Sequence, residues 1–129
     1  MALGQIARIA GAAIGGFFAW WVVATVVDIV LRISWPEYAA VEKAMTFTLG
    51  MQIARLANGA VASLAAGFIT AWISRRRPIA TGLLVILLLA LFIPVHISLW
   101  AKFPAWYHLV FFASLAFLPL VGLTRRAAR

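Results

Sequence analysis

Cysteine is absent from this sequence of 129 residues, and acidic residues are scarce, since Asp and Glu together number 3. Without cysteine there is no disulfide, no thiolate nucleophile and no cysteine-ligated zinc or iron–sulfur cluster. Charged residues of both signs make up 11% of the chain, whereas a typical soluble domain has about 25%. A chain with so few charges cannot cover its surface with groups that bind water, which argues against a soluble domain.

Apolar residues dominate instead, at 66% of the sequence. A helix needs about 20 apolar residues to cross the hydrocarbon core of a bilayer, which is roughly 30 Å thick. Four stretches qualify, at about residues 9–27, 51–73, 79–99 and 103–123. We therefore expect an all-α integral membrane protein in which residues 1–129 form one domain, a bundle of four transmembrane helices.

A short interfacial segment, at about residues 34–50, is expected between the first two helices. The run Ser34-Trp35-Pro36-Glu37 fits the capping-box pattern, in which a serine side chain and a glutamate three residues later bind the first backbone N–H groups of a helix. The pattern predicts a short helix starting at Ser34.

The basic residues flank the apolar runs, which is the usual topology signal of membrane proteins. Seven basic residues are expected on the same side of the membrane as the amino terminus. They are Arg8, Arg75, Arg76, Arg77, Arg125, Arg126 and Arg129. Because no acidic residue accompanies them, the positive-inside rule predicts that both termini lie in the cytoplasm. The placement also predicts membrane lipid, and no nucleic acid, as a partner. The abundance of alanine, and of arginine over lysine, favours a bacterial source, so the expected membrane is the bacterial inner membrane.

Small residues recur at four-residue spacing on the first two helices. The first includes Gly11 and Gly15, and the second includes Gly59, Ser63 and Gly67. In lipid there is little hydrophobic drive for helices to associate, so close backbone approach at small residues has to supply the contact. We expect a tight pair between these helices, either within one chain or across the axis of a homo-oligomer or larger membrane assembly.

One ionisable side chain from each helix falls at a similar depth. Asp28, Arg55, His96 and His108 all lie about 26–30 Å from the cytoplasmic basic residues, at a rise of about 1.5 Å per residue. Charges inside a membrane are costly unless they are paired or wetted, so they are candidates for a functional site. We expect Asp28 and Arg55 to form an ion pair, with Asn58 on the face of Arg55.

The two histidines lie near the facing ends of a helical hairpin, where their imidazoles could meet. They could bind a metal or a haem, accept protons near neutral pH, or serve only as structural hydrogen-bonding groups. Because His96 and His108 have no fixed ligand spacing, we expect no metal and no cofactor. No serine or cysteine accompanies them and Asp28, so we expect no catalytic site.

These expectations favour a small, non-enzymatic inner-membrane protein with an outward-facing polar cluster. It would act as an accessory, scaffold or ligand-binding subunit. The alternative is an oligomeric transporter or channel subunit for a small solute or for protons. A membrane protein that binds haem or a metal is less favoured.

Overall fold

The computed structural model describes residues 2–124, and four of its helical segments are long and apolar enough to cross a membrane. Three of them are α1 (Leu3–Ser34), α3 (Leu49–Ser74) and α4 (Pro78–Ser98). The fourth runs from α5 (Ala105–Phe117) through the 3-10 turn η2 (Leu118–Leu120) into α6 (Val121–Thr124). A short helix, α2 (Pro36–Glu42), joins α1 to α3, and the 3-10 turn η1 (Trp100–Lys102) joins α4 to α5. The expected all-α fold with four candidate spans is confirmed.

Local sequence signals explain where several helices begin and end. The Thr48 side chain accepts a hydrogen bond from the Met51 N–H and so caps the start of α3. Arg75 closes α3 in the left-handed conformation, at φ 56°. Pro78 then opens α4 at the first helical position, where its missing N–H costs nothing.

Two boundary predictions are corrected. The first helix is longer than the predicted residues 9–27, because α1 continues past Arg8 and Asp28 without a break. The predicted capping box at Ser34 is wrong, since Ser34 is the last residue of α1. The short helix does form, but Trp35 is its cap and no side chain binds the first N–H groups. Proline at its first position is the signal that remains.

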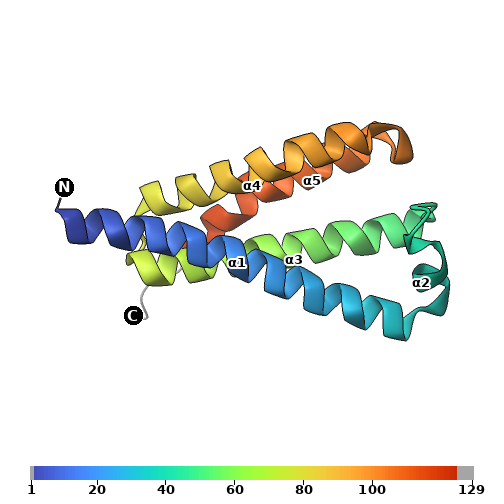
Figure 1. The fold of residues 1–129 in the computed structure, drawn as a ribbon, viewed down its shortest axis with the longest axis horizontal. Helices are drawn as coiled ribbons and strands as arrows, with labels where there is room; N and C mark the ends of the chain where they lie inside the picture. Colours follow the sequence, from blue (N-terminus) through green and yellow to red (C-terminus); the bar gives the residue numbers. More distant parts are fainter. Residues whose placement is uncertain (1, 125–129) are drawn as a thin grey trace.

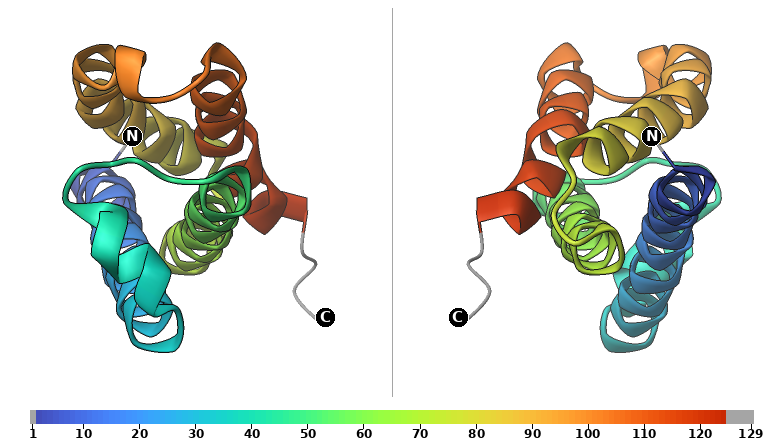
Figure 2. Two further views of the ribbon diagram at one scale, coloured as in Figure 1. Left: turned by 90° about the vertical axis from the view of Figure 1, so that its right-hand side faces the viewer. Right: turned by 90° about the vertical axis from the view of Figure 1, so that its left-hand side faces the viewer.

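The bundle has two different ends. One end, which we call the arginine end, holds the start of α1, the α3–α4 connection with Arg75, Arg76 and Arg77, and α6 (Figure 1). The opposite end, which we call the α2 end, holds α2 and η1. Seen along the bundle, α1 lies between α3 and α4, and α5 completes the ring (Figure 2). The α1–α3 pair and the α4–α5 pair lie close at the arginine end and diverge toward the α2 end (Figure 1).

The core fills the region where all four segments meet. Trp20 of α1 is central to it: the indole N–H donates to the Ser63 hydroxyl at 3.0 Å, and the ring contacts Phe92 and Phe111 at centroid distances of 4.8 and 6.3 Å. Around this aromatic layer lie buried small and aliphatic side chains, which are Ala62, Ala66, Leu84, Leu88 and Leu115. This part of the core extends from the aromatic layer toward the arginine end, and a second buried cluster lies at the α2 end, with Tyr38, Phe47, Met51, Phe103 and Tyr107.

The helix α1 packs on α3 through a face next to the predicted one. Gly16 is buried, and a Cβ there would lie 2.9 Å from the Ala66 carbonyl oxygen. Beside it the Thr70 hydroxyl donates to the Ala12 carbonyl at 3.0 Å. Gly11 is exposed, with nothing within 4 Å of such a Cβ. The prediction that Gly11 packs on the second helix within one chain is therefore wrong, because the buried face of α1 is turned by about one residue.

The predicted small-residue face of α3 is buried, but it has two neighbours. Ser63 faces α1 through its bond to Trp20. Gly59 lies against the Phe111 ring of α5, and Gly67 lies against the backbone of Pro119 in η2. On α1, Gly15 is in close contact with the Ile73 side chain. Gly67 thus brings the last segment, and not α1, to close backbone distance, and Gly59 makes room for the Phe111 ring.

Candidate functional site

A cavity of about 400 Å³ lies between the two helix pairs, toward the α2 end. Its polar lining comes from all four segments and from α2, with Asp28, Arg32, Glu42, Arg55, Asn58, His96 and Tyr107. Its apolar lining includes the aromatic layer of the core, with Trp20, Trp21, Phe92 and Phe111. One cavity therefore contains three of the four ionisable residues that the sequence assigned to a common depth.

The cavity has an opening between α1 and α4. Thr25 and Ile29 of α1 line the cavity and are exposed, and so is Val95 of α4. These two helices diverge toward the α2 end (Figure 1). Trp21 and Phe92 stack across the same pair at a centroid distance of 5.7 Å, and they mark where the opening closes. The lateral opening thus extends from these stacked rings toward the α2 end.

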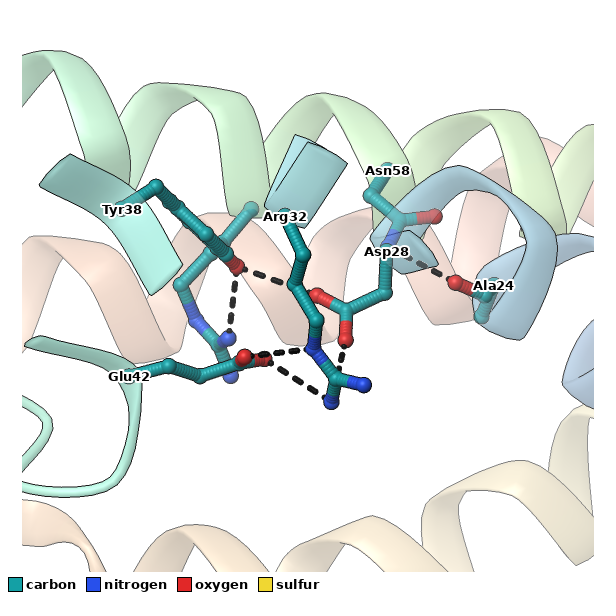
Figure 3. Close-up of polar contacts among 7 residues, drawn as sticks. Ala24, Asp28, Arg32, Tyr38, Glu42 and Asn58 are labelled. Carbon is teal, nitrogen blue, oxygen red and sulfur yellow. Dashed lines mark hydrogen bonds and ion pairs between the residues drawn. The ribbon is translucent and has the colours of Figure 1, made fainter. Parts of the chain in front are cut away.

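Two carboxylates share Arg32 at the polar side of the cavity (Figure 3). The Arg32 Nη2 atom lies 2.8 Å from Asp28 Oδ2, one helical turn away on α1. The same guanidinium donates to both Glu42 carboxylate oxygens, at 2.6 and 3.3 Å. This arrangement ties the end of α1 to the end of α2, and it neutralises part of the charge that Asp28 brings into the helix bundle.

The predicted ion pair between Asp28 and Arg55 is wrong, because a tyrosine stands between them. The Tyr38 hydroxyl donates to Asp28 Oδ1 at 3.2 Å and accepts from Arg55 Nη1 at 3.0 Å (Figure 3). The Tyr107 hydroxyl accepts from Arg55 Nε at 3.2 Å. The guanidinium also lies 4.7 Å from the centroid of the Phe47 ring, within the range of a cation–π contact. Two phenols and an aromatic face therefore hold the Arg55 cation.

The protonation states on α2 agree with these bonds. Burial raises the pKa of the Tyr38 phenol and outweighs the opposing effect of Arg55, so the hydroxyl keeps the proton that it donates to Asp28. Burial by itself would raise the pKa of the Glu42 carboxyl, but the hydrogen bonds from Arg32 and the Arg32 charge bring that pKa below its ordinary value. Glu42 is therefore ionised at neutral pH, as its pair with Arg32 requires.

Asn58 lies on α3 beside Arg55, as the sequence indicated, and binds α1. Its amide Nδ2 donates to the Ala24 carbonyl at 3.1 Å (Figure 3). The other amide atom, Oδ1, is buried and accepts no hydrogen bond from the described residues 2–124. A buried acceptor without a donor costs about 1–3 kcal/mol. Asn58 thus ties α3 to α1 beside the cavity, with its Oδ1 atom enclosed between the helices.

The two histidines meet, as their places in the hairpin predicted. Their Nδ1 atoms lie 2.6 Å apart, and His108 Nε2 lies 3.3 Å from the Trp100 carbonyl oxygen. A carbonyl can only accept, so when both imidazoles are neutral His108 carries its proton on Nε2 and accepts on Nδ1. His96 must then donate from Nδ1, which leaves its Nε2 as an unprotonated acceptor. His96 is 5% exposed and lines the cavity, and within the described chain its Nε2 has no hydrogen-bond partner.

The histidine pair is arranged as a hydrogen bond and not as two ligands of one ion. Two nitrogens on a tetrahedral zinc, each at about 2.0–2.1 Å, would lie roughly 3.3 Å apart. The shorter Nδ1–Nδ1 distance of 2.6 Å fits a shared proton. Among residues 2–124 no group of three or more histidine, aspartate or glutamate side chains could hold a metal ion.

Four site residues escaped the sequence analysis, and they are Arg32, Tyr38, Glu42 and Tyr107. The Asp28–Arg32 pair could have been found, since charges of opposite sign four residues apart meet on one helical face. The two tyrosines resemble ordinary interfacial aromatic residues in the sequence, and only the fold brings their hydroxyls to Arg55. The site is therefore larger and better paired than the sequence predicts.

We expect Tyr38→Phe to destabilise the protein more than Tyr107→Phe. Tyr38 makes two hydrogen bonds, one to Asp28 and one to Arg55, whereas Tyr107 makes one, to Arg55. Each bond is worth about 0.5–1.5 kcal/mol, or more when a partner is charged. The two substitutions remove the same atom, so they control for each other. The measurement is the free energy of unfolding in mixed micelles. Equal losses, or a larger loss for Tyr107→Phe, would contradict the bridging role of Tyr38.

No protein-family model, no curated protein and no solved structure matches this chain. Its function is therefore argued from the cavity. The lining offers cationic donors in Arg32 and Arg55, an unused acceptor in His96, and an aromatic surface. Donors, acceptors and apolar surface in one concave site are the properties of a small-molecule binding site.

Proposed function

We propose that this protein is a non-enzymatic, multi-pass protein of the bacterial inner membrane that binds an amphipathic, lipid-soluble molecule in the cavity at the α2 end. The observation that carries this proposal is the division of one cavity into a charged, hydrogen-bonding part and an aromatic part. Its volume of about 400 Å³ is in the range of small-molecule sites, which is about 300–1,000 Å³.

The lateral opening supports a ligand that comes from the bilayer. If the four segments cross the membrane, the exposed lining residues Thr25 and Val95 face lipid chains and not water. A molecule dissolved in the bilayer could then enter between α1 and α4 with its polar head toward Arg55. A purely water-soluble ligand would have no use for an opening on this side.

The proposed orientation has the arginine end in the cytoplasm and both termini inside. Arg8, Arg75, Arg76 and Arg77 lie at this end, and the positive-inside rule retains such residues on the side of synthesis. Arg125, Arg126 and Arg129, which the same prediction used, lie outside the described residues. The cavity would then occupy the outer half of the membrane, where Asp28, Arg32 and Arg55 are near the interface.

The packing beyond the aromatic layer supports binding in preference to transport. Trp20, Phe92 and Phe111 close the inner end of the cavity, and buried alanine and leucine side chains fill the bundle behind them. The Thr70 hydroxyl in that region is bound to the Ala12 carbonyl. The transporter alternative would need a path formed between copies of the chain, and assembly into an oligomer, for instance at the exposed Gly11, stays a prediction.

The proposal is tested with three probes of one chain length that each carry a terminal bromine, namely an alcohol, a carboxylate and an alkane. Bromine quenches nearby indoles, and Trp20 and Trp21 line the cavity. We expect at least one probe to quench tryptophan fluorescence of the purified protein saturably, and the unbrominated probe to reverse the quenching by competition.

Two substitutions on α1 provide the control. Thr25→Phe would insert a ring into the cavity, and we expect it to abolish the saturable quenching. Val26→Phe adds a ring at the next position, which is 54% exposed and does not line the cavity, and we expect it to leave the quenching intact. Quenching by none of the probes, or equal quenching in both variants, would refute the proposed function.

A further inference from the structure

We propose that the head of the ligand is uncharged and carries a hydroxyl group, so that the cavity selects lipid-soluble alcohols or phenols. This inference rests on the proposed function and names the class of molecule that the site takes. It follows from one hydrogen-bond acceptor and one donor that the polar lining leaves unused, and from the balance of the charges in that lining.

One acceptor in the lining lacks a donor. In the neutral histidine pair, His96 Nε2 is left unprotonated by the chain of hydrogen bonds that begins at the Trp100 carbonyl and passes through His108. His96 lines the cavity. A ligand that satisfies this nitrogen must therefore donate a hydrogen bond.

A donor faces the same cavity. Arg55 uses Nε for Tyr107 and Nη1 for Tyr38, and its Nη2 has no hydrogen-bond partner among residues 2–124. A ligand head that meets this group must accept a hydrogen bond. A hydroxyl can donate one bond and accept two, so a single such group fits an acceptor and a donor in one site.

The charges of the lining already balance. Arg32 and Arg55 carry two positive charges, and Asp28 and Glu42 carry two negative ones when ionised. An anionic head would bring a net negative charge to a site that is balanced without it, and it could not donate to the unprotonated His96 Nε2. An alkane would bring no charge but would leave that acceptor unpartnered. A neutral hydroxyl satisfies both requirements.

The remaining lining fits a hydrocarbon body. Trp21 and Phe92 stack with an interplanar angle of 22°, and Trp20 and Phe111 complete an apolar surface beyond the polar groups. A ligand with its hydroxyl at His96 would have its chain or ring against these faces. Contact of that body with the indoles is what makes quenching a suitable measure of binding.

The same three brominated probes test the inference. The measurements are made at about pH 8.5, where the carboxylate probe is ionised and a histidine of ordinary pKa is neutral. We expect the alcohol to bind up to about ten-fold more tightly than the alkane, the factor that corresponds to one good hydrogen bond. We also expect it to bind more tightly than the carboxylate, which cannot donate to His96. In His96→Phe, which lacks the acceptor, we expect the preference for alcohol over alkane to disappear. His96→Gln keeps an acceptor and should retain part of it.

The outcomes separate this inference from the proposed function. Tighter binding of the carboxylate, or of the alkane, would overturn the hydroxyl assignment and leave the cavity as a ligand site. An alcohol preference that persists unchanged in His96→Phe would likewise overturn it. The comparison of probes on the unmodified protein needs no variant, so a folding defect of His96→Phe would not obscure the result. Saturable binding of none of the three would refute both proposals.

Discussion

Replacement of Gly67 by alanine is expected to destabilise the bundle by about 1–3 kcal/mol, the usual cost of forcing extra atoms into a well-packed core. A Cβ at this position would overlap the backbone of Pro119, and the Gly122 backbone lies against the same residue. Backbone cannot rotate out of the way as a side chain can, so α3 would have to separate from η2 and α6. The intrinsic preference of helices for alanine, worth about 1 kcal/mol, would offset only part of this loss.

Gly11→Ala is the matched control. It adds the same methyl group to a helix, but nothing lies within 4 Å of the new Cβ. We expect its stability to equal that of the unmodified protein or to exceed it slightly. The midpoint of thermal unfolding, followed by size-exclusion chromatography in mild detergent, distinguishes the two. A similar loss in both variants would mean that the close approach of α3 to the last segment is not what holds the bundle.

The second large effect is expected for Trp20→Ala, at about 2–4 kcal/mol. Removal of a buried tryptophan from a soluble core costs about 3–5 kcal/mol, and part of that value reflects transfer from water, which is smaller when the solvent is lipid. Trp20 contacts Phe92 and Phe111, and its indole donates to the buried Ser63. Its loss would open a void at the junction of all four segments.

Trp72→Ala removes the same side chain from the exposed surface of the bundle. Trp72 lies on α3 and is 78% exposed, so we expect a change of less than about 0.5 kcal/mol. Trp20→Ala should also enlarge the cavity at the aromatic layer and weaken binding of the brominated probes. If the stability losses of the two variants were equal, the aromatic layer could not be the centre of the core.

Hydropathy alone predicts most of the fold. The four apolar runs, and the turn at Arg75, Arg76, Arg77 and Pro78, predict the helices and their order. Each run is long enough for one crossing of the membrane, and polar or turn residues separate it from the next run. The sequence does not predict the rotation of α1 about its own axis. The spacing of small residues on α1 fits packing through the face of Gly11 as well as packing through the face of Gly16. Only contact with Thr70 of α3 decides between them, and that contact joins residues far apart in the chain.

The sequence predicts the depth of the candidate site along the helices, but it does not predict which side chains bind one another there. Counting along each helix correctly groups Asp28, Arg55 and His96, because helical rise is constant. It cannot show that α2 folds back and inserts the Tyr38 hydroxyl between the two charges. Nor can it show a cavity, which arises because the helix pairs diverge. Side-chain pairing across helices depends on their crossing angles, which a linear pattern does not contain.

The central claim is that the polar cavity lies on the outer side of the membrane, and the absence of cysteine allows a direct test. Lys43→Cys introduces a thiol near the end of α2, and Pro78→Cys introduces one at the arginine end without removing an arginine. Both positions are exposed. In intact spheroplasts, a membrane-impermeant maleimide is expected to label the thiol at position 43 and to label that at position 78 only after permeabilisation. Labelling of position 78 alone in intact spheroplasts would contradict the claim.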